Sequence, residues 1–399
     1  MKIRNIAFHR IKAALALGAG IALLAPAASP YSLKAEAAVQ QPEDMDDETW
    51  GRLLDDTMEY EEIPNLIEFF NPAYRSAADS VEDGLKDSYD LVEKMREDGK
   101  EYRQQAKGLE AEGDMIYSAQ YKAMAKSLSS AASTMEKTLD KQARRLDQNT
   151  LAPIRYQLSS AVQSLFIGYK QMEVNREMLE KMVQLYSSML SMSDTQSQIG
   201  MATSTDLLSA KVSLTSVQNQ LQTLDNSMDS MRRTLIMLTG WDYTDNPALG
   251  AVPEPDMSRI ASIDREADKV KAIAYNQSII SLKNTKEANR TVKDIHSKER
   301  SVTDAEEQLR SNMDTLYYSL LEKQAALQAA DTAFLQAQLT MDSNNRRYEL
   351  GMLGQAEYLG TQITYCQAKA ARDTANMNML QALNEYNWAL KGVVSVEQN

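Results

Sequence analysis

Histidine, cysteine and neighbouring carboxylates are the side chains that could carry out chemistry in this sequence, and they are few. The only histidines are His9 and His296, and the only cysteine is Cys366. A metal site has no imidazole pair to build on, and no phosphate-binding glycine loop, nucleophile elbow or HExxH motif occurs. Adjacent acids such as Glu306 and Glu307 are typical of solvated helix faces. We therefore expect no enzyme activity, no metal and no cofactor.

Two further acids, Asp206 and Glu357, each follow a glycine-containing break in a helical pattern. Two interpretations stay open. Rings of these carboxylates, one from each copy in an assembly, could gate a pore mouth, because they repel one another unless a cation or a basic partner relieves them. An acid in the first turn of a helix also simply stabilises the positive end of the helix dipole.

The elements that must position these acids are long helices with an apolar repeat of seven residues. Apolar residues recur in steps of three and four until a break at 350–354 that contains two glycines, and helix resumes from Gln355 to Leu390. The apolar positions are Leu309, Met313, Leu316, Leu320, Leu327, Phe334 and Met341. This pattern predicts a coiled-coil seam, and the break predicts a reversal of the chain.

The same unit occurs earlier in the chain, displaced by 151 positions without a gap. Gly200 aligns with Gly351 and Met201 with Met352, and a second seam follows. Its members are Leu207, Ala210, Leu214, Val217, Leu221, Leu224, Met228, Met231, Leu235 and Leu238. The chain is therefore predicted to be a duplicated helical hairpin, with helices of about 60 Å for about 40 residues.

Composition and charge predict export. Basic residues, an apolar run and Ala35-Glu36-Ala37 together indicate a signal peptide over residues 1–37, and no later segment is apolar enough to span a membrane. The formal charge of −13 becomes −17 once the five bases and one acid of the leader are removed. We therefore do not expect nucleic acid or anionic lipid surfaces as partners.

Local composition divides the rest of the chain. The predicted segments are an acidic disordered leader at 38–62, a first helical repeat at 63–241 with an extra helical insertion at about 99–150, a Pro/Gly linker at 242–256, a second helical repeat at 257–392 and a C-terminal tail at 393–399. Gly99 and Gly108 are expected to punctuate the insertion, and Pro153 to interrupt or kink the helix after it. In the second repeat we predict one helix over about 260–298 and a capping box at Thr303–Glu306 that starts the long helix.

Several motifs gather around the two turns and along the helix after the second. They are Ile199 to Thr203, Tyr348 to Gly351, Glu357 to Leu359, Gln367 to Arg372 and Leu380 to Asn387. Together with the duplication and the proline-rich midpoint linker, these motifs resemble the TolC family of outer-membrane efflux proteins. The resemblance covers about residues 71–392 and is most specific at the turns.

The resemblance implies a homotrimer whose hairpins close into a helical tube, the TolC-like α-barrel. It also implies a passive export conduit that docks to a periplasmic membrane-fusion adaptor coupled to an inner-membrane pump, ABC-type or other. The adaptor-docking tips would be Ile199, Gly200, Met201, Ala202, Thr203, Leu350, Gly351 and Met352. Asp206 and Glu357 would then lie just inside the mouth.

The expected fold is all-α, with elongated antiparallel helical hairpins and a two-fold internal repeat. Family members carry a pair of β-strands in each half, and no alternating pattern predicts them here, so we expect little or no β structure. The expected location is the cell envelope, either the outer membrane and periplasm or the wall side of a cell with one membrane. The alternative function is an exported structural or adhesive coiled-coil rod at the cell surface without a transport role.

Overall fold

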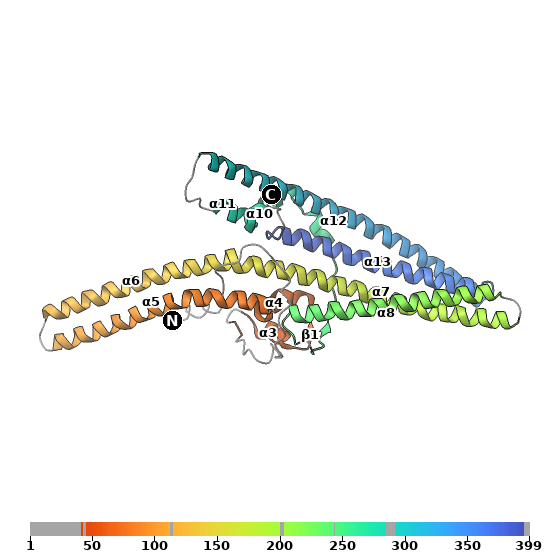
Figure 1. Ribbon diagram of the computed structural model, residues 1–399, viewed down its shortest axis with the longest axis horizontal. Helices are drawn as coiled ribbons and strands as arrows, with labels where there is room; N and C mark the ends of the chain where they lie inside the picture. The colour runs from red at the N-terminus through yellow and green to blue at the C-terminus, as the bar shows by residue number, and fades with distance from the viewer. Residues whose placement is uncertain are drawn as a thin grey trace. The chain divides into compact units, whose positions relative to one another are not determined.

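The computed structural model describes residues 41–42, 45–111, 115–199, 203–242, 244–284 and 292–394, so the predicted signal peptide lies outside the described residues. Long helices joined by short connections dominate these ranges (Figure 1). The chain divides into two compact units. Unit 1 comprises Met1–Asp56, Pro64–Arg155 and Leu238–Asp242, and unit 2 comprises Thr57–Ile63, Tyr156–Met237 and Tyr243–Asn399. None of the described helices has the length and apolar character needed to cross a lipid bilayer.

Unit 1 is built around a hairpin of α5 (Pro72–Ala111) and α6 (Met115–Leu146), which pack side by side (Figure 1). Buried residues recur at seven-residue spacing and are Leu85, Val92, Gly99 and Ala106 on α5 and Ser118, Ala125, Ala132 and Leu139 on α6. Gly99 and Gly108 lie inside α5 rather than between helices. A Cβ on Gly99 would lie 3.6 Å from the carbonyl oxygen of Ala125. The small side chains therefore let the two backbones approach closely.

The helix does not stop at Pro153. α6 continues through a π-helical turn, Asp147–Leu151, into α7 (Ala152–Gln198). Proline has no N–H to donate to the carbonyl four residues back, and its ring clashes with that carbonyl in an α-helix. A wider turn immediately before the proline relieves this conflict.

The predicted disordered leader is wrong for residues 47–62, which fold. Helix α3 (Asp47–Leu54) is capped by Asp46, whose carboxylate accepts a hydrogen bond from the backbone N–H of Thr49 at 2.8 Å. Trp50 packs on α4 (Ile63–Phe70), with ring centroids 5.6 Å from Phe69 and 6.2 Å from Phe70. These aromatic contacts supply apolar burial, which the acidic composition of the segment did not suggest.

Unit 2 contains two long hairpins and a series of short elements. α7 pairs with α8 (Ser204–Leu238), and α12 (Val292–Glu349) pairs with α13 (Gln355–Ala389) (Figure 1). The short elements are a 3-10 helix (Tyr60–Glu62), α9 (Met257–Ala261), α10 (Arg265–Tyr275) and α11 (Gln277–Asn284). In the described part of the chain, strand occurs only as β1 (Thr57–Met58) paired in parallel with β2 (Ala248–Leu249). The predicted all-α fold with little or no β structure is confirmed.

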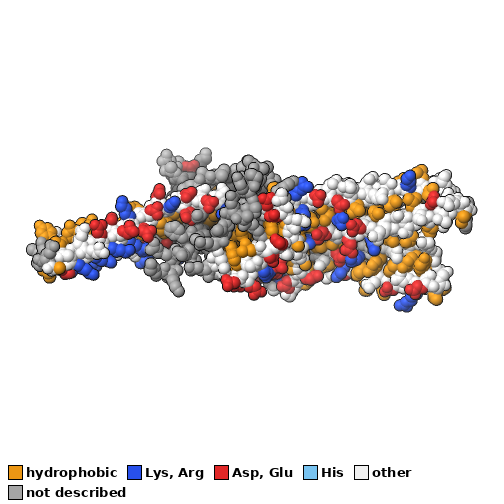
Figure 2. Space-filling view, turned by 90° about the horizontal axis from the view of Figure 1, so that it is seen from below, with side chains coloured by type: hydrophobic (Ala, Val, Ile, Leu, Met, Phe, Trp, Pro, Cys, Tyr) orange, Lys and Arg blue, Asp and Glu red, His pale blue; other side chains and the backbone are white. Residues whose placement is uncertain are grey.

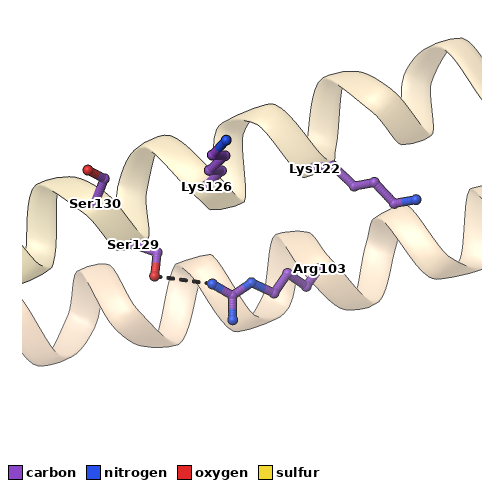
Figure 3. A pocket seen from close by; sticks show the side chains of 5 residues that line it. All are labelled: Arg103, Lys122, Lys126, Ser129 and Ser130. Atoms are coloured by element: carbon purple, nitrogen blue, oxygen red, sulfur yellow. Dashed lines mark hydrogen bonds between the residues drawn. The ribbon is translucent and has the colours of Figure 1, made fainter.

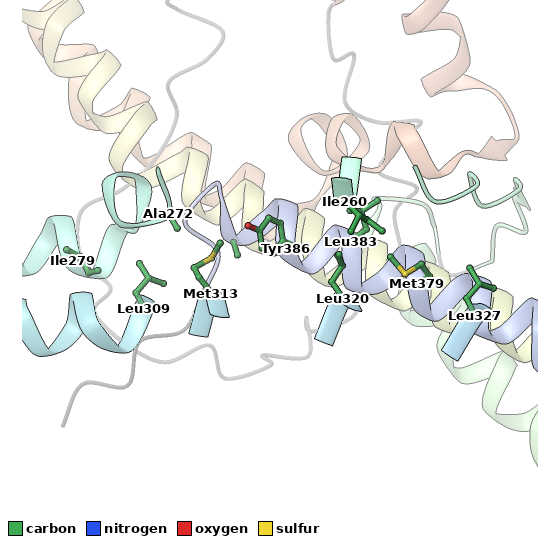
Figure 4. Packing of buried hydrophobic residues seen from close by; sticks show 11 residues of the cluster. Ile260, Ala272, Ile279, Leu309, Met313, Leu320, Leu327, Met379, Leu383 and Tyr386 are labelled. Atoms are coloured by element: carbon green, nitrogen blue, oxygen red, sulfur yellow. The ribbon is translucent and has the colours of Figure 1, made fainter. Parts of the chain in front are cut away.

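Both predicted seams are buried or half-buried along their length. In the second repeat the α12 residues pack against α13 and the short helices (Figure 4). The buried members include Leu309, Met313, Leu320 and Leu327 of α12 and Met379, Leu383 and Tyr386 of α13. In the first repeat Val217 of α8 packs against Leu179 and Met182 of α7. The apolar stripes therefore hold each hairpin together.

Two predictions for the start of the second repeat are wrong. The helix expected over 260–298 is divided into α9, α10 and α11, and α12 begins at Val292 rather than at Thr303. The Thr303 hydroxyl donates a hydrogen bond to the carbonyl oxygen of Glu299 at 2.9 Å. This backward bond is how a threonine is accommodated inside a helix, so the capping-box sequence does not mark a helix start here.

A buried asparagine closes each repeat. Asn71 donates from Nδ2 to the carbonyl oxygen of Leu238 at 2.6 Å, and Asn276 donates to the carbonyl oxygens of Gly392 and Val394 at 3.3 and 3.1 Å. Both asparagines are 1 % exposed. Each also caps the helix that follows it, by accepting from a backbone N–H three residues on. The asparagines therefore link the start of each repeat to its end.

A glycine in the left-handed region lies beside each asparagine. Gly240 has φ +82° and Gly392 has φ +85°. A Cβ on Gly240 would lie 2.3 Å from the carbonyl oxygen of Phe70, and one on Gly392 would lie 2.2 Å from that of Tyr275. Phe70 and Tyr275 directly precede Asn71 and Asn276, so both repeats end in the same local structure.

Candidate functional site

The turn between α12 and α13 is an ordered helix end. The N–H of Met352 donates to the carbonyl oxygen of Arg347 at 2.8 Å, and the N–H of Gly351 donates to that of Tyr348 at 2.9 Å. This pair of bonds defines a Schellman motif, in which a left-handed residue ends the helix. Gly351 supplies that conformation, with φ +71°. The glycine is therefore needed for the shape of the tip.

Side-chain contacts fasten the two helices just below this turn. The rings of Tyr348 and Tyr358 stack with their centroids 4.2 Å apart and 5° between their planes. One layer further from the tip, Asn344 donates from Nδ2 to the hydroxyl oxygen of Thr361 at 2.9 Å. The sequence pattern did not predict these two contacts, although two tyrosines ten positions apart across a turn are a signal for the ring stack.

The tip presents apolar side chains to solvent. Leu350 is 73 % exposed and Met352 is 68 % exposed, whereas Leu353 is buried at 6 %. Leu353 therefore anchors the turn from within, and the other two side chains project from it. Exposed apolar residues on an ordered element are a common feature of protein interaction sites.

The first tip is described only at its two edges. Ile199, directly after α7, is 64 % exposed, and Thr203 is exposed immediately before α8. The predicted tip residues Gly200, Met201 and Ala202 lie outside the described residues. An exposed apolar residue thus occurs at this turn as well.

The two acids occupy equivalent helix positions. Asp206 is the third residue of α8 and Glu357 the third residue of α13. Glu357 is exposed, and the side chain of Asp206 lies outside the described part of the structure. Acids at this position stabilise the helix N-terminus, which agrees with the dipole interpretation. Their placement at a pore mouth stays a prediction.

Contacts between the two hairpins place both turns at the same end of unit 2. Polar side-chain pairs join α7 to α13. The residue numbers of the partners on α7 rise as those of the partners on α13 fall. The pairs are Gln163 with Trp388 at 2.8 Å, Gln171 with Asn378 at 2.9 Å and Glu177 with Lys369 at 2.9 Å. The helices are therefore antiparallel, and the end of α7 and the start of α13 lie at the same end. Ile199 therefore lies at the same end of unit 2 as Leu350 and Met352.

No group of three His, Cys, Asp or Glu side chains that could hold a metal ion occurs in the described ranges. Burial raises the pKa of the Cys366 thiol, which disfavours the reactive thiolate.

No protein-family model matches the sequence, and no curated protein matches it. Among solved structures, the chain is similar to the outer-membrane channel OprN, with 11 % identical residues, 94 % of this chain and 99 % of that chain covered, and a TM-score of 0.44. It is similar to the CmeC outer membrane channel of Campylobacter jejuni, with 12 % identical residues, 66 % of this chain and 69 % of that chain covered, and a TM-score of 0.43. It is also similar to the outer membrane protein VceC of Vibrio cholerae, with 13 % identical residues, 66 % of this chain and 75 % of that chain covered, and a TM-score of 0.35. Two of these three structures are described as outer-membrane channels and the third as an outer membrane protein.

Proposed function

We propose that the chain is one subunit of a passive export conduit. Copies of the chain, three by the family resemblance, close around an axis, and the two turns at one end dock a membrane-fusion adaptor coupled to a pump. The observation that carries the proposal is the pair of repeated hairpins whose turns lie at the same end and expose Ile199, Leu350 and Met352.

The docking step is supported by the way the second tip is built. Leu350 and Met352 lie on a turn that backbone hydrogen bonds and the Tyr348–Tyr358 stack hold in place. Little conformational entropy is lost when such preorganised side chains bind a partner. Apolar side chains fixed at a helical tip suit a partner that offers an apolar groove.

The closure of copies is supported by one flank of α12. Leu321, Leu335 and Leu339 are 37, 57 and 62 % exposed, and their spacing places them on one side of the helix, beside the buried seam. Burial of such a flank against another copy would remove apolar surface from water, at about 25 cal/mol per Å². A solitary rod leaves this flank exposed.

Site-specific photo-crosslinking in the native cell tests the proposal. A photoreactive amino acid at Met352 is expected to give an adduct with a membrane-anchored envelope protein. The same group at Leu339 is the matched control on the same helical hairpin, and it is expected to give adducts between copies of this chain. If neither position gives an adduct, or Met352 gives only adducts between copies, the chain is a rod without a docked adaptor.

A further inference from the structure

Basic side chains gather on one face of the α5/α6 hairpin. Arg103 of α5 and four residues of α6 line a shallow depression of about 410 Å³, and these residues are Lys122, Lys126, Ser129 and Ser130. Arg103 donates from Nη2 to the hydroxyl oxygen of Ser129 at 3.1 Å. Figure 3 shows that Lys122 reaches towards α5, while Lys126 and Ser130 extend from α6. The depression therefore presents N–H and O–H groups from both helices.

Most of this positive charge is not neutralised within the described residues. Lys122 forms an ion pair with Glu110, but no carboxylate of the described chain lies within ion-pair distance of Arg103 or Lys126. Lys100 and Lys107 are three and four positions from Arg103, so they lie on the same side of α5 as Arg103. We term Lys100, Arg103, Lys107, Lys122, Lys126 and Ser129 the cationic face.

The cationic face contrasts with the rest of the chain. α6 carries six basic residues against two acids, whereas the whole sequence has a formal charge of −13. Like charges held close together repel one another. An anion bound across the face would remove that repulsion.

Apolar side chains of the hairpin lie on the opposite flank. Leu91, Tyr117 and Met124 are 49, 56 and 49 % exposed, and the 3.6-residue helical period separates Tyr117 and Met124 from Lys122 and Lys126. Figure 2 shows hydrophobic and basic side chains along opposite edges of this end of the hairpin. A helix that binds a bilayer places its apolar residues and its cations towards the same lipid surface. The arrangement therefore favours a hydrophilic anion over a membrane.

We propose that the cationic face binds the phosphate groups of a linear phosphate polymer. The Arg103 guanidinium offers paired N–H donors that match phosphate oxygens, the lysines add point charges on both sides of it, and the serine hydroxyls are further donors. The expectation that nucleic acid and anionic lipid surfaces are not partners rested on net charge alone. Local charge decides binding at a separated face, because the Debye length is only about 10 Å at 0.1 M salt.

Titration of the full mature chain with medium-chain inorganic polyphosphate tests this proposal. The Arg103→Ala/Lys126→Ala double variant is expected to raise the Kd at least tenfold. It is also expected to reduce the slope of log K against log salt by about 1.4, for two phosphate contacts on a flexible strand. The matched control is Lys86→Ala/Lys94→Ala, which removes the same charge from exposed positions of α5 outside the cationic face. This control is expected to change the Kd less than twofold.

Three outcomes overturn the proposal. The first is that the unaltered chain does not bind polyphosphate, and the second is that both double variants weaken binding equally, which would indicate a response to net charge. The third is tighter binding to phosphatidylglycerol vesicles than to polyphosphate, which would assign the hairpin to a membrane. None of these outcomes bears on docking at the two tips, because the cationic face lies in unit 1 and the tips in unit 2.

Discussion

At the residue scale, three glycines differ in how well their positions would accept a side chain. Gly392 has φ +85° and no room for a Cβ, Gly351 has φ +71° with no atom within 4 Å of a Cβ, and Gly360 lies within α13 with open space around it. Gly392→Ala should therefore lower the free energy of unfolding by more than Gly351→Ala. The latter should cost about 1–2 kcal/mol for the left-handed conformation alone.

Urea unfolding followed by circular dichroism measures these differences. Gly360→Ala is the control, and it should stabilise the chain by up to about 1 kcal/mol, because alanine is the better helix former. We attribute the larger effect at Gly392 to the carbonyl oxygen of Tyr275, which leaves no room for a Cβ. This explanation is wrong if the Gly392→Ala variant unfolds no more readily than the Gly351→Ala variant.

A charged network between α10 and α12 gives a second prediction, for pH dependence. Hydrogen bonds from Arg265 at 2.5 Å and Lys269 at 2.9 Å hold the pKa of Asp314 below its ordinary value of 3.8. The folded chain therefore favours the carboxylate. Its stabilising effect is complete at pH values above 3.8 and is lost as the pH falls through the lowered pKa.

Asp314→Asn should accordingly lower the free energy of unfolding at pH 7, and the difference from the unaltered chain should shrink as the pH falls below 3.8. Denaturant titrations at a series of pH values measure this. Glu307→Gln is the control, because Glu307 is 72 % exposed and 3.7 Å from Arg310. It should leave the free energy of unfolding nearly unchanged. A difference for Asp314→Asn that persists at the lowest pH would contradict the assignment.

The sequence predicts some residue positions well and others not at all. Seam residues such as Val217, Leu235 and Leu320 are buried as expected, because helical periodicity alone decides which face packs. The closing bonds of Asn71 and Asn276 reach partners more than one hundred positions away. Their pairing depends on how the repeat returns to its start, and no local pattern encodes that.

At the element scale, the α5/α6 hairpin depends on a seam of small residues. Ala132 is buried, and its neighbour Ala131 is exposed on the same helix. Ala132→Leu should force the helices apart and cost roughly 1–3 kcal/mol by overpacking. Ala131→Leu adds the same atoms on the solvent side and should stay within about 0.5 kcal/mol.

Amide hydrogen exchange across α5 and α6 measures the stability of this hairpin directly. Faster exchange is expected in the Ala132→Leu variant alone. Equal protection of the amide hydrogens from exchange in both variants would mean that the stability of the hairpin does not depend on the close approach of α5 and α6.

The same small residues explain where prediction of the elements went wrong. Gly99 and Gly108 were expected to punctuate the insertion because isolated glycine destabilises a helix. Gly99 lies instead in the seam opposite Ala125, where its lack of a side chain permits the approach of α6. A tertiary contact therefore outweighs local propensity at Gly99. The turn at 350–354 was predictable because a break that contains two glycines follows the seam there.

At the scale of the whole molecule, duplication decides where the candidate site lies. The repeat brings two turns to one end through the antiparallel packing of α7 and α13. Sequence alone indicated the turns, but contacts such as Gln171 with Asn378 were needed to place them on a common surface. Nothing in a linear pattern fixes the relation between two hairpins 151 positions apart, since either parallel or antiparallel packing satisfies the seams.

The last prediction concerns the association of copies through the exposed flank of α12, which the proposed conduit requires. Leu335→Glu/Leu339→Glu places charges where the flank would contact another copy, and buried unpaired charge strongly disfavours association. Light scattering should give the mass of three copies for the mature chain and of one copy for this variant. Leu350→Ser/Met352→Ser is the control, since it removes equally exposed apolar residues from the tip and should keep the mass of three. Helicity should be unchanged in both variants, because neither pair lies in a buried seam. A single-copy mass for the unaltered chain would favour the rod, and an unchanged mass for the Glu variant would show that the copies close through another surface.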